Sequence, residues 1–399
     1  MSVEWIELPS EILESISKLF SFYTDYLRLR AVCHSWRSSL PKNPLHFPPQ
    51  LPCLMLSPRA FFHLPNHKTH LLNLPEPSNG IRYCGSSHGW LVILDDSPNV
   101  RLLNPVTRET LHLPRVNTFP DVVSFSYSNI GREYLVANPR GGVHALNLNQ
   151  MRNCYVKKIV LSSSPSPCLQ NCDNFAAFAI VGKGQHSLGF CKKGHDSWGF
   201  VISDEMYCWE DVVYQNGLFY AVTKEGTIAV CDIYGYESPQ VTVIQTTTPF
   251  EFCGDIYYVV FSGVDMLLVA RNLEQEFDNN DDGGDECNLV YRTVGFDVFK
   301  MNWSEMKWEK IESLGDRVLF LGGNSSLCLI ASDFVGCLKD CIYFTDDYSD
   351  SNYDDACGKH DVGVFSLWDQ SIELLPCYPR NSYSRLGWPL PIWVSPNPC

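Results

Sequence analysis

The sequence predicts a mainly β protein, a six- or seven-bladed β-propeller preceded by a small all-α module. Two observations carry this prediction. Apolar residues recur at helical spacing near the N-terminus, between residues 8 and 40. After residue 80 the chain changes to short apolar runs separated by Gly, Asp, Asn and Pro. Groups of these runs start about 40 to 50 residues apart, which is the period of a propeller blade.

Residues 1–40 are expected to form two or three short helices. Pro9 precedes a run of apolar residues at helical spacing, and Ser10 with Glu11 suits a helix N-terminus. A second apolar stripe ends at Pro41, which cannot continue a helix. Helices of this length cannot enclose a core of their own. We therefore expect their apolar faces to bind a partner surface, in the same chain or on another protein.

Residues 41–80 are rich in proline, which excludes long helices and central strands. We expect a linker that contains short edge strands, with the apolar runs 54–56 and 60–64 as candidates. The propeller is expected over residues 81–399. A ring of blades must close to hide its terminal strands. The strands near Leu54 and the unusually apolar C-terminal segment 389–394 are the candidates for this closure.

Four segments of the large domain share one plan: an apolar strand, a polar turn and a second strand centred on Val or Ile. They start at Gly89, Arg132, Asn216 and Cys341. A β-sandwich needs about seven strands in about a hundred residues and would not go on repeating for roughly three hundred. The repeat therefore favours a propeller. Six or seven blades fit the spacing, and the choice depends on how residues 319–330 are assigned.

The N-terminal motifs resemble the F-box, the segment by which substrate receptors of ubiquitin ligases bind a Skp-family adaptor. The resemblance lies in the Leu-Pro opening at Leu8, the helix with Glu11, and the run VCHSWR from Val32. It implies binding to the adaptor and, through it, to a cullin. The adaptor-binding residues that it implies are Leu8, Pro9, Ile12, Leu13, Ile16, Leu27, Val32, Cys33 and Trp36. Five of them are expected to be buried only in the complex: Pro9, Leu13, Ile16, Val32 and Trp36.

The large domain resembles a plant F-box family whose C-terminal domain, long of unknown function, is described as a KIB-type β-propeller. The matching motifs are GSSHGWL from Gly85, DVVYQNGLFYAVTKEG from Asp211, SLGDRVLFLG from Ser313 and GCLKDCIYFTDD from Gly336. The resemblance implies the substrate-recognition subunit of an SCF-type (Skp-cullin-F-box) ubiquitin ligase. The propeller would then bind a target protein that the sequence does not identify. No catalytic residue or cofactor is needed for this role, and the expected location is the cytoplasm, the nucleus or both.

Two other classes of function stay open at this point. The chain could bind the adaptor and act outside a ligase, in which case cullin would not co-purify with it. It could also be an enzyme with a site in the central channel of the propeller. Converging carboxylates or histidines in that channel would favour the enzyme, and no motif in the sequence predicts them.

Charge and cysteine content exclude several partners. The chain has 30 basic and 45 acidic residues, a net charge of −15, which repels phosphate backbones and anionic lipid headgroups. We therefore expect neither nucleic acid nor a membrane as a partner. Seventeen cysteines are scattered over the whole length and odd in number, so we expect reduced thiols. No pair has the Cys-x-x-Cys spacing, and no zinc site is expected.

Three motifs could carry chemistry, and each has a simpler interpretation. Gly85 to Gly89 match the G-x-S-x-G pattern around Ser87, but a strand follows where that motif needs a helix. Asp278, Asn280, Asp282 and Gly283 match the opening of a calcium loop, yet Leu289 occupies the place of its closing glutamate. Two acidic runs, residues 274–286 and 346–355, are expected to be solvated loops.

Overall fold

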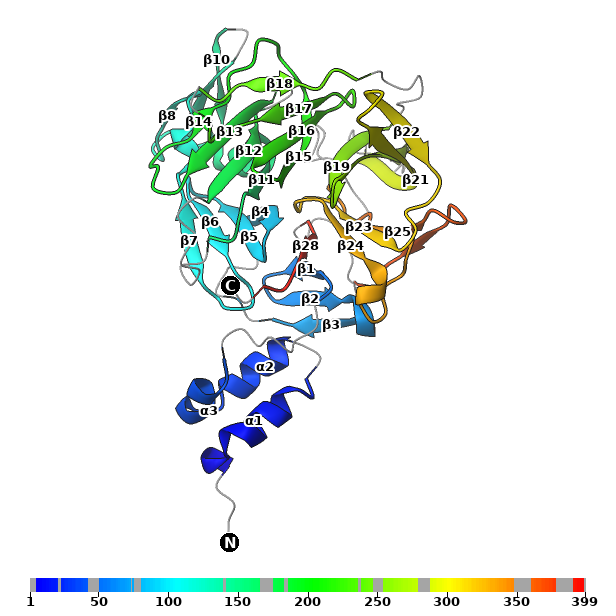
Figure 1. Ribbon diagram of the computed structural model, residues 1–399. Helices are drawn as coiled ribbons and strands as arrows, with labels where there is room; N and C mark the ends of the chain where they lie inside the picture. Colours follow the sequence, from blue (N-terminus) through cyan, green and yellow to red (C-terminus); the bar gives the residue numbers. More distant parts are fainter. Residues whose placement is uncertain are drawn as a thin grey trace.

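Strand pairing closes the chain into a ring, with three short helices attached at its edge (Figure 1). The computed structural model describes residues 5–20, 23–41, 50–72, 74, 80–138, 141–165, 175–182, 186–235, 238–246, 254–278, 288–347, 360–377 and 390–397. Within these residues the strands form seven sheets. Six of them surround a common axis as the blades of a β-propeller (Figure 1).

The helical module consists of a 3-10 turn and three helices, namely η1 (Trp5–Glu7), α1 (Ser10–Ser17), α2 (Tyr23–Arg30) and α3 (His34–Ser39). Pro9 stands at the N-cap of α1, where its missing N–H costs nothing. Cys33 caps α3, and its Sγ accepts a hydrogen bond from the Trp36 N–H at 3.5 Å.

The module has a small core of its own, contrary to the expectation from helix length. Tyr23 and Tyr26 of α2 supply the missing apolar volume, and their ring centroids lie 5.9 Å apart. The buried residues of this core are Leu13, Tyr23, Tyr26, Leu29, Trp36 and Leu40. Leu13 is 0% exposed and Trp36 7% exposed without any partner chain, so the expectation that these two are buried only in a complex is wrong.

The first blade combines both ends of the propeller chain. Its strands are β28 (Ile392–Val394), β1 (Cys53–Ser57), β2 (Ala60–His63) and β3 (Lys68–Leu71), in that order. β28 runs antiparallel to β1 and pairs Trp393 with Leu54. The two segments that the sequence offers as closing strands therefore lie side by side, and neither leaves a free inner edge.

The other five blades follow in chain order. The second contains β4 (Ile81–Ser87), β5 (Trp90–Asp95), β6 (Val100–Leu103) and β7 (Thr110–Leu113). The third contains β11 (Val156–Leu161), β12 (Ala176–Val181), β13 (Ser187–Lys192) and β14 (Gly199–Phe200). The fourth contains β15 (Trp209–Gln215), β16 (Leu218–Thr223), β17 (Ile228–Cys231) and β18 (Val241–Val243). The fifth contains β19 (Ile256–Ser262), β20 (Asp265–Asp278), β21 (Asn288–Asn302) and β22 (Lys307–Ile311).

The sixth blade has five strands in the order β24-β23-β25-β26-β27, and β23 runs parallel to β25. They are β23 (Arg317–Leu321), β24 (Leu327–Ile330), β25 (Cys341–Phe344), β26 (Gly363–Ser366) and β27 (Ile372–Leu374). Short helical turns connect strands elsewhere: η2 (Leu64–Asn66), η3 (Val116–Thr118), α4 (Leu148–Gln150), η4 (Met151–Tyr155) and η5 (Ala331–Asp333).

A three-stranded sheet outside the ring explains why the blade count was ambiguous. It consists of β8 (Val122–Phe125), β9 (Tyr134–Ala137) and β10 (Val143–Leu146). β4 of the second blade lies directly against β11 of the third, and Leu161 N–H donates to Ser87 Oγ at 3.2 Å. No blade fits between them. The extra sheet packs Tyr134, Val136 and Leu146 onto the core that the second and third blades share.

The acidic segments differ from the expected solvated loops. The first begins inside β20, and the hairpin with β21 continues to the pair Asp278 and Asn288. Glu274 is paired with Arg292 across the two strands, so strand pairing and opposite charge outweigh the acidic composition. In the second segment Asp346 is 1% exposed, because it faces hydrogen-bond donors at the ring axis. Residues 279–286 and 348–355 lie outside the described residues.

Candidate functional site

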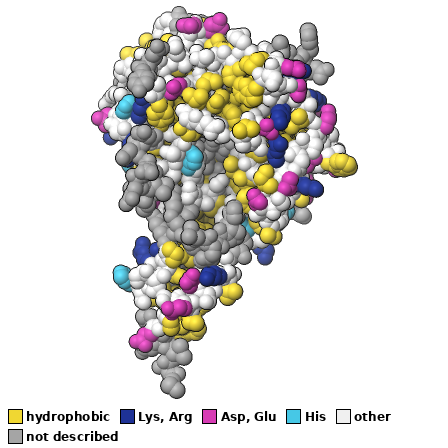
Figure 2. Space-filling model, viewed as in Figure 1, with side chains coloured by type: hydrophobic (Ala, Val, Ile, Leu, Met, Phe, Trp, Pro, Cys, Tyr) yellow, Lys and Arg dark blue, Asp and Glu magenta, His cyan; other side chains and the backbone are white. Residues whose placement is uncertain are grey.

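Two regions of the structure can carry function, the helical module and the ring axis. On the module, Ile12 and Val32 are 47% and 59% exposed, and Pro9 is exposed beside them in sequence. Leu8, Ile16, Leu27 and Cys33 are half-buried and pack against the module's core. Trp5 and Leu19 are also exposed apolar residues that the sequence motif did not single out. Figure 2 shows apolar side chains interspersed with charged ones on this module.

Leu13 and Trp36 support this surface from below. The Trp36 indole Nε1–H donates to the carbonyl of Trp5 at 3.0 Å, which ties η1 to α3. Leu13 and Trp36 also share one core with the tyrosines of α2. Of the nine residues that the F-box resemblance implies, these two hold the helices together, while Ile12 and Val32 are available to a partner.

The module touches the propeller through a turn of the second blade. Val106, which follows β6, packs against the core of the module. Asn104 in the same turn is buried and donates its Nδ2–H to the carbonyl of Asn397 at 2.8 Å. The side chain of Asn397 in turn donates to the carbonyl of His88 at 2.9 Å. This chain of contacts links the helices to one end of the ring axis.

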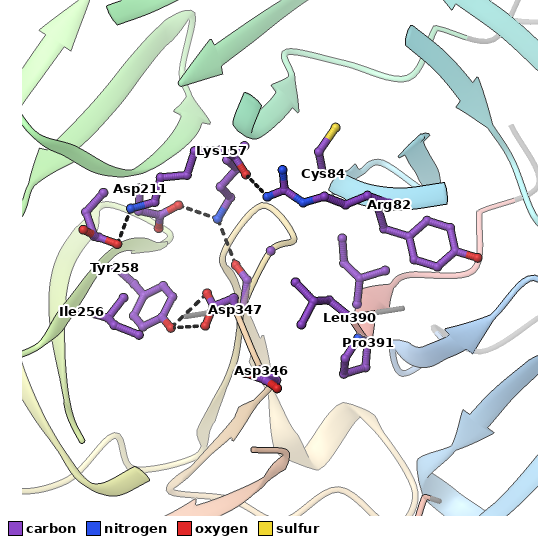
Figure 3. Close-up of a pocket in the computed structure, with 16 residues that line it drawn as sticks. Arg82, Cys84, Lys157, Asp211, Ile256, Tyr258, Asp346, Asp347, Leu390 and Pro391 are labelled. Atoms are coloured by element: carbon purple, nitrogen blue, oxygen red, sulfur yellow. Dashed lines mark hydrogen bonds and ion pairs between the residues drawn. The ribbon is translucent and has the colours of Figure 1, made fainter. Parts of the chain in front are cut away.

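At the other end of the axis, charged side chains converge from several blades (Figure 3). Lys158 of β11 lies 2.5 Å from Asp211 Oδ1 of β15, and its Nζ also donates to the carbonyl of Gly322 at 3.1 Å. Asp211 Oδ2 accepts from Ser326 Oγ at 2.8 Å and from Val259 N at 3.2 Å. One carboxylate therefore connects the third, fourth and fifth blades to the segment between β23 and β24.

Arg271 of β20 makes a second connection and is 0% exposed. Its guanidinium donates to Asp347 Oδ1 at 2.9 Å and to Asp361 Oδ2 at 3.0 Å. It also donates to the hydroxyl of Tyr258 at 3.1 Å, and that hydroxyl donates to Asp347 at 2.9 Å. Burial raises the pKa of Asp347, and the neighbouring Arg271 charge opposes this shift. The arrangement fixes the fifth blade to the sixth.

Lys157 and Glu210 complete the group, with Nζ and Oε1 2.5 Å apart. We call Lys157, Lys158, Glu210, Asp211, Arg271 and Asp347 the ion-pair cluster. The sequence analysis did not identify it. A signal existed, because these charged residues interrupt strands that are otherwise apolar and buried, as in VKKIVL from Val156.

The space within this end of the axis is about 40 Å³, room for one or two water molecules. Four carboxylates border it, those of Glu210, Asp211, Asp346 and Asp347. Each already has a partner: Asp346 accepts from His360 Nδ1 at 2.8 Å and from Tyr291, and the other three belong to the ion-pair cluster. Such pairs hold blades together and leave no carboxylate available to act on a substrate.

The candidate motifs from the sequence are structural where the chain is described. Ser87 ends β4, and His88 and Gly89 form the turn to β5, which confirms a strand-turn-strand unit in place of a nucleophile motif. Asp278 ends β20, while Asn280, Asp282 and Gly283 lie outside the described residues. Burial raises the pKa of the Cys84 and Cys377 thiols to about 12, so both stay protonated at neutral pH.

Two negative findings apply to the described part of the chain. It contains no group of three or more His, Cys, Asp or Glu side chains arranged to hold a metal ion. None of its helices is long and apolar enough to cross a membrane.

The fold and the two regions together define an F-box β-propeller protein. A family model of the F-box domain matches residues 5–48, and one described as the KIB1-4 beta-propeller matches residues 61–366. The second match spans more than half of the chain. The chain therefore belongs to the KIB1-4 β-propeller family and carries an N-terminal F-box. In general terms, the F-box supports a substrate-recognition role in a Skp-cullin-F-box ubiquitin ligase.

Similar proteins are known from Arabidopsis thaliana. The F-box protein SKIP23 is 29% identical, over 98% of this chain and 96% of that relative. The F-box protein At2g26160 is 26% identical, over 86% of this chain and 96% of that relative. A solved structure, the Cps50 (Swd1) β-propeller domain of Myceliophteria thermophila, covers 87% of this chain and 96% of its own at 11% identity, with a TM-score of 0.34. The six-blade count therefore rests on this chain's own strand pairing.

Proposed function

We propose that this protein is the substrate-recognition subunit of an SCF-type ubiquitin ligase, with the helical module bound to a Skp-family adaptor and the propeller bound to a target protein. The observation that carries the proposal is the module's surface. The module has its own core, yet it exposes Ile12 and Val32 at positions matched by the F-box model. Apolar residues exposed on a folded module point to a protein partner.

The adaptor contact is proposed to involve Leu8, Pro9, Ile12, Ile16, Leu27, Val32 and Cys33 directly. Leu13 and Trp36 act through them, because they hold α1 and α3 in position. The adaptor connects the chain to a cullin, and ubiquitin transfer takes place on other subunits. The chain's own task is then to hold a target lysine near activated ubiquitin, which raises its effective concentration.

Neither alternative function gains an observation that favours it. Carboxylates do converge on the ring axis, as an enzyme would need, but all four are paired around a space of about 40 Å³. Action outside a ligase predicts that the adaptor binds without cullin. Action in the cytoplasm, the nucleus or both is part of the proposal.

The proposal is tested by substitution at the exposed positions of the module. Val32→Asp and Ile12→Asp place a charge in the proposed contact without touching the core, and each should weaken adaptor binding at least tenfold, or about 1.4 kcal/mol. Leu71→Asp is the matched control, since Leu71 is 86% exposed and belongs to β3 of the propeller. Calorimetry with purified adaptor measures the affinities. Equal affinities for all four proteins would exclude this surface, and adaptor binding without cullin would favour the alternative role.

A further inference from the structure

The axis of the ring has a second, larger space at the end opposite the ion-pair cluster. Its volume is about 330 Å³. Three inner strands contribute to both ends: β4 with Arg82 and Ser87, β11 with Lys158 and Leu161, and β15 with Asp211 and Tyr214. The ion-pair cluster fills one end of the axis, so the larger space is a cavity that is closed at its base.

The lining of this cavity differs from the rest of the chain in charge. Charged residues make up 19% of the sequence, yet none of the seventeen described residues that line the cavity is Lys, Arg, Asp or Glu. Five serines line it, and Tyr214, Phe261 and Trp393 supply aromatic surface. His88 at its rim donates its Nε2–H to the carbonyl of Leu161 at 3.2 Å. The cavity therefore offers neutral polar groups and aromatic rings to a ligand.

Two buried polar atoms beside the cavity lack a hydrogen-bond partner among the described residues. They are Nε1 of Trp393, which is 2% exposed, and Oδ1 of Asn324, which is 3% exposed. Both residues line the cavity. Buried polar groups are nearly always paired in folded proteins. One donor and one acceptor left over at the same cavity match the N–H and C=O groups of a bound peptide.

The walls are held in place by bonds that do not involve a ligand. Ser326 Oγ donates to Asp211 of the ion-pair cluster at 2.8 Å, and Asn324 Nδ2 donates to the carbonyl of Phe320 at 3.1 Å. The Ser325 N–H donates to the carbonyl of Ser86 at 2.8 Å. A preformed cavity of this size lies at the lower end of the range for ligand sites, roughly 300 to 1,000 Å³. It has room for one or two side chains of a longer segment.

We propose that this cavity is the target-binding site and takes an uncharged peptide segment that inserts one large apolar or aromatic side chain. The proposal rests on the proposed function as a substrate receptor and adds to it the chemistry of the target. Acidic, phosphorylated or basic segments are disfavoured, because a charged group would lose its hydration in a cavity that supplies no opposite charge. The rim also connects to the helical module through His88, Asn397 and Asn104, so the target is held at the end of the ring nearest the module's contact.

The test uses the full chain bound to purified Skp-family adaptor and immobilised through the adaptor. A phage-displayed library of random twelve-residue peptides is selected against this complex. Enriched peptides should share one Leu, Ile, Phe, Tyr or Trp and lack charged residues next to it. Enrichment of acidic or basic motifs, or of no peptide at all, would overturn the cavity proposal. Failure of the chain to bind the adaptor would instead count against the proposed function, which separates the two.

Substitutions then locate the binding. Ser325→Arg fills the cavity and should lower the affinity of a synthetic selected peptide at least tenfold by fluorescence anisotropy. Ser128→Arg adds the same charge at an exposed turn far along the chain and should leave the affinity unchanged. Gln215→Glu changes the charge of the lining at nearly constant volume, and a repeated selection should now enrich peptides with Lys or Arg. Unchanged peptide affinity in Ser325→Arg, or unchanged selection in Gln215→Glu, would place the peptide elsewhere.

Discussion

Arg271 shows how a single residue can fix two blades. A fully buried charge is stable only with partners, and Arg271 has Asp347, Asp361 and the Tyr258 hydroxyl within 3.1 Å. Asp361 also accepts the backbone N–H of Thr293 at 2.8 Å. Asp347 and Asp361 flank the strands β25 and β26 of the sixth blade, while Arg271 and Thr293 belong to the fifth. Removal of the arginine would leave two buried carboxylates without their cation.

Arg271→Met should therefore reduce the free energy of unfolding by about 3 to 5 kcal/mol. Arg292→Met is the matched control in the adjacent strand, where the side chain is 70% exposed and its pair with Glu274 lies in solvent. An exposed pair contributes about 0 to 1 kcal/mol. Urea unfolding followed by tryptophan fluorescence measures both changes. Equal losses in the two variants would contradict a structural role for the ion-pair cluster.

His63 links stability to pH. It is 8% exposed in β2, and burial lowers its pKa below the usual 6.5, while a hydrogen bond with Asn66 opposes this shift. As pH falls below 6.5, the unfolded chain takes up a proton at this position while the folded chain stays neutral. The unfolded state then binds more protons, so stability falls as pH falls through this window and is fully present above it.

His63→Gln removes the titrating group from both states. The decrease in unfolding free energy between pH 7.5 and 5.5 should be smaller in this variant than in the unchanged protein. Urea unfolding at several pH values measures the slope. An identical slope in both proteins would show that His63 has the same pKa folded and unfolded.

Among the elements, β28 has the largest effect for its length. It has three residues, yet it supplies the inner strand of the first blade and pairs with β1 across the whole sequence. Its Trp393 packs on Phe320 at a centroid distance of 5.2 Å, and its Ile392 and Val394 enter the core next to the second blade. Without β28 the ring would be open at its inner edge, and β1 would present an unpaired strand.

Deletion of residues 389–399 should cause aggregation or a large loss of melting temperature, because the first blade loses its inner strand. A synthetic peptide of residues 389–397 added in excess should restore part of the melting temperature by binding beside β1. A peptide of the same composition in scrambled order is the control. Differential scanning fluorimetry and size-exclusion chromatography report the outcome. A truncated chain that melts like the full one would show that β28 is dispensable.

At the scale of the whole molecule, the helical module and the propeller have separate cores. The module contacts the ring mainly at Val106, and the propeller's own clusters contain none of its residues. The family matches follow the same division, with the F-box model over residues 5–48 and the propeller model from residue 61. The finer boundaries at residues 40 and 80 stay predictions.

A chain beginning at Pro41 should fold and melt within a few degrees of the full protein, because it loses none of the six blades. It should still bind the selected peptides and fail to bind the adaptor, and in cells it should inhibit the ligase by holding the target. Circular dichroism, a melting curve and adaptor pull-down measure these properties. A chain beginning at Gly80 is the contrast, since it lacks β1 to β3. If the first chain aggregated like the second, the helices would belong to the propeller's core.

Local pattern was sufficient for the parts of this protein that depend on local pattern. The spacing of apolar residues indicated helices before residue 40, and the strand-turn-strand repeat indicated a propeller. The closing strands could also be named, because a proline-rich start and an apolar end such as PIWV have few other uses in a ring. The F-box motif and the net charge of −15 narrowed the class of partner.

Tertiary structure alone decided what depends on side chains far apart in sequence. Trp36 resembled a partner contact until Tyr26 and Leu13 were seen to bury it. Asp346 looked like part of a solvated loop, although His360 and Tyr291 hold it at the axis. The cavity is assembled from six blades' worth of separate segments, none of which carries a motif. A sequence records which residues can form strands, but burial and pairing of polar groups are set only when the ring closes and brings those strands together.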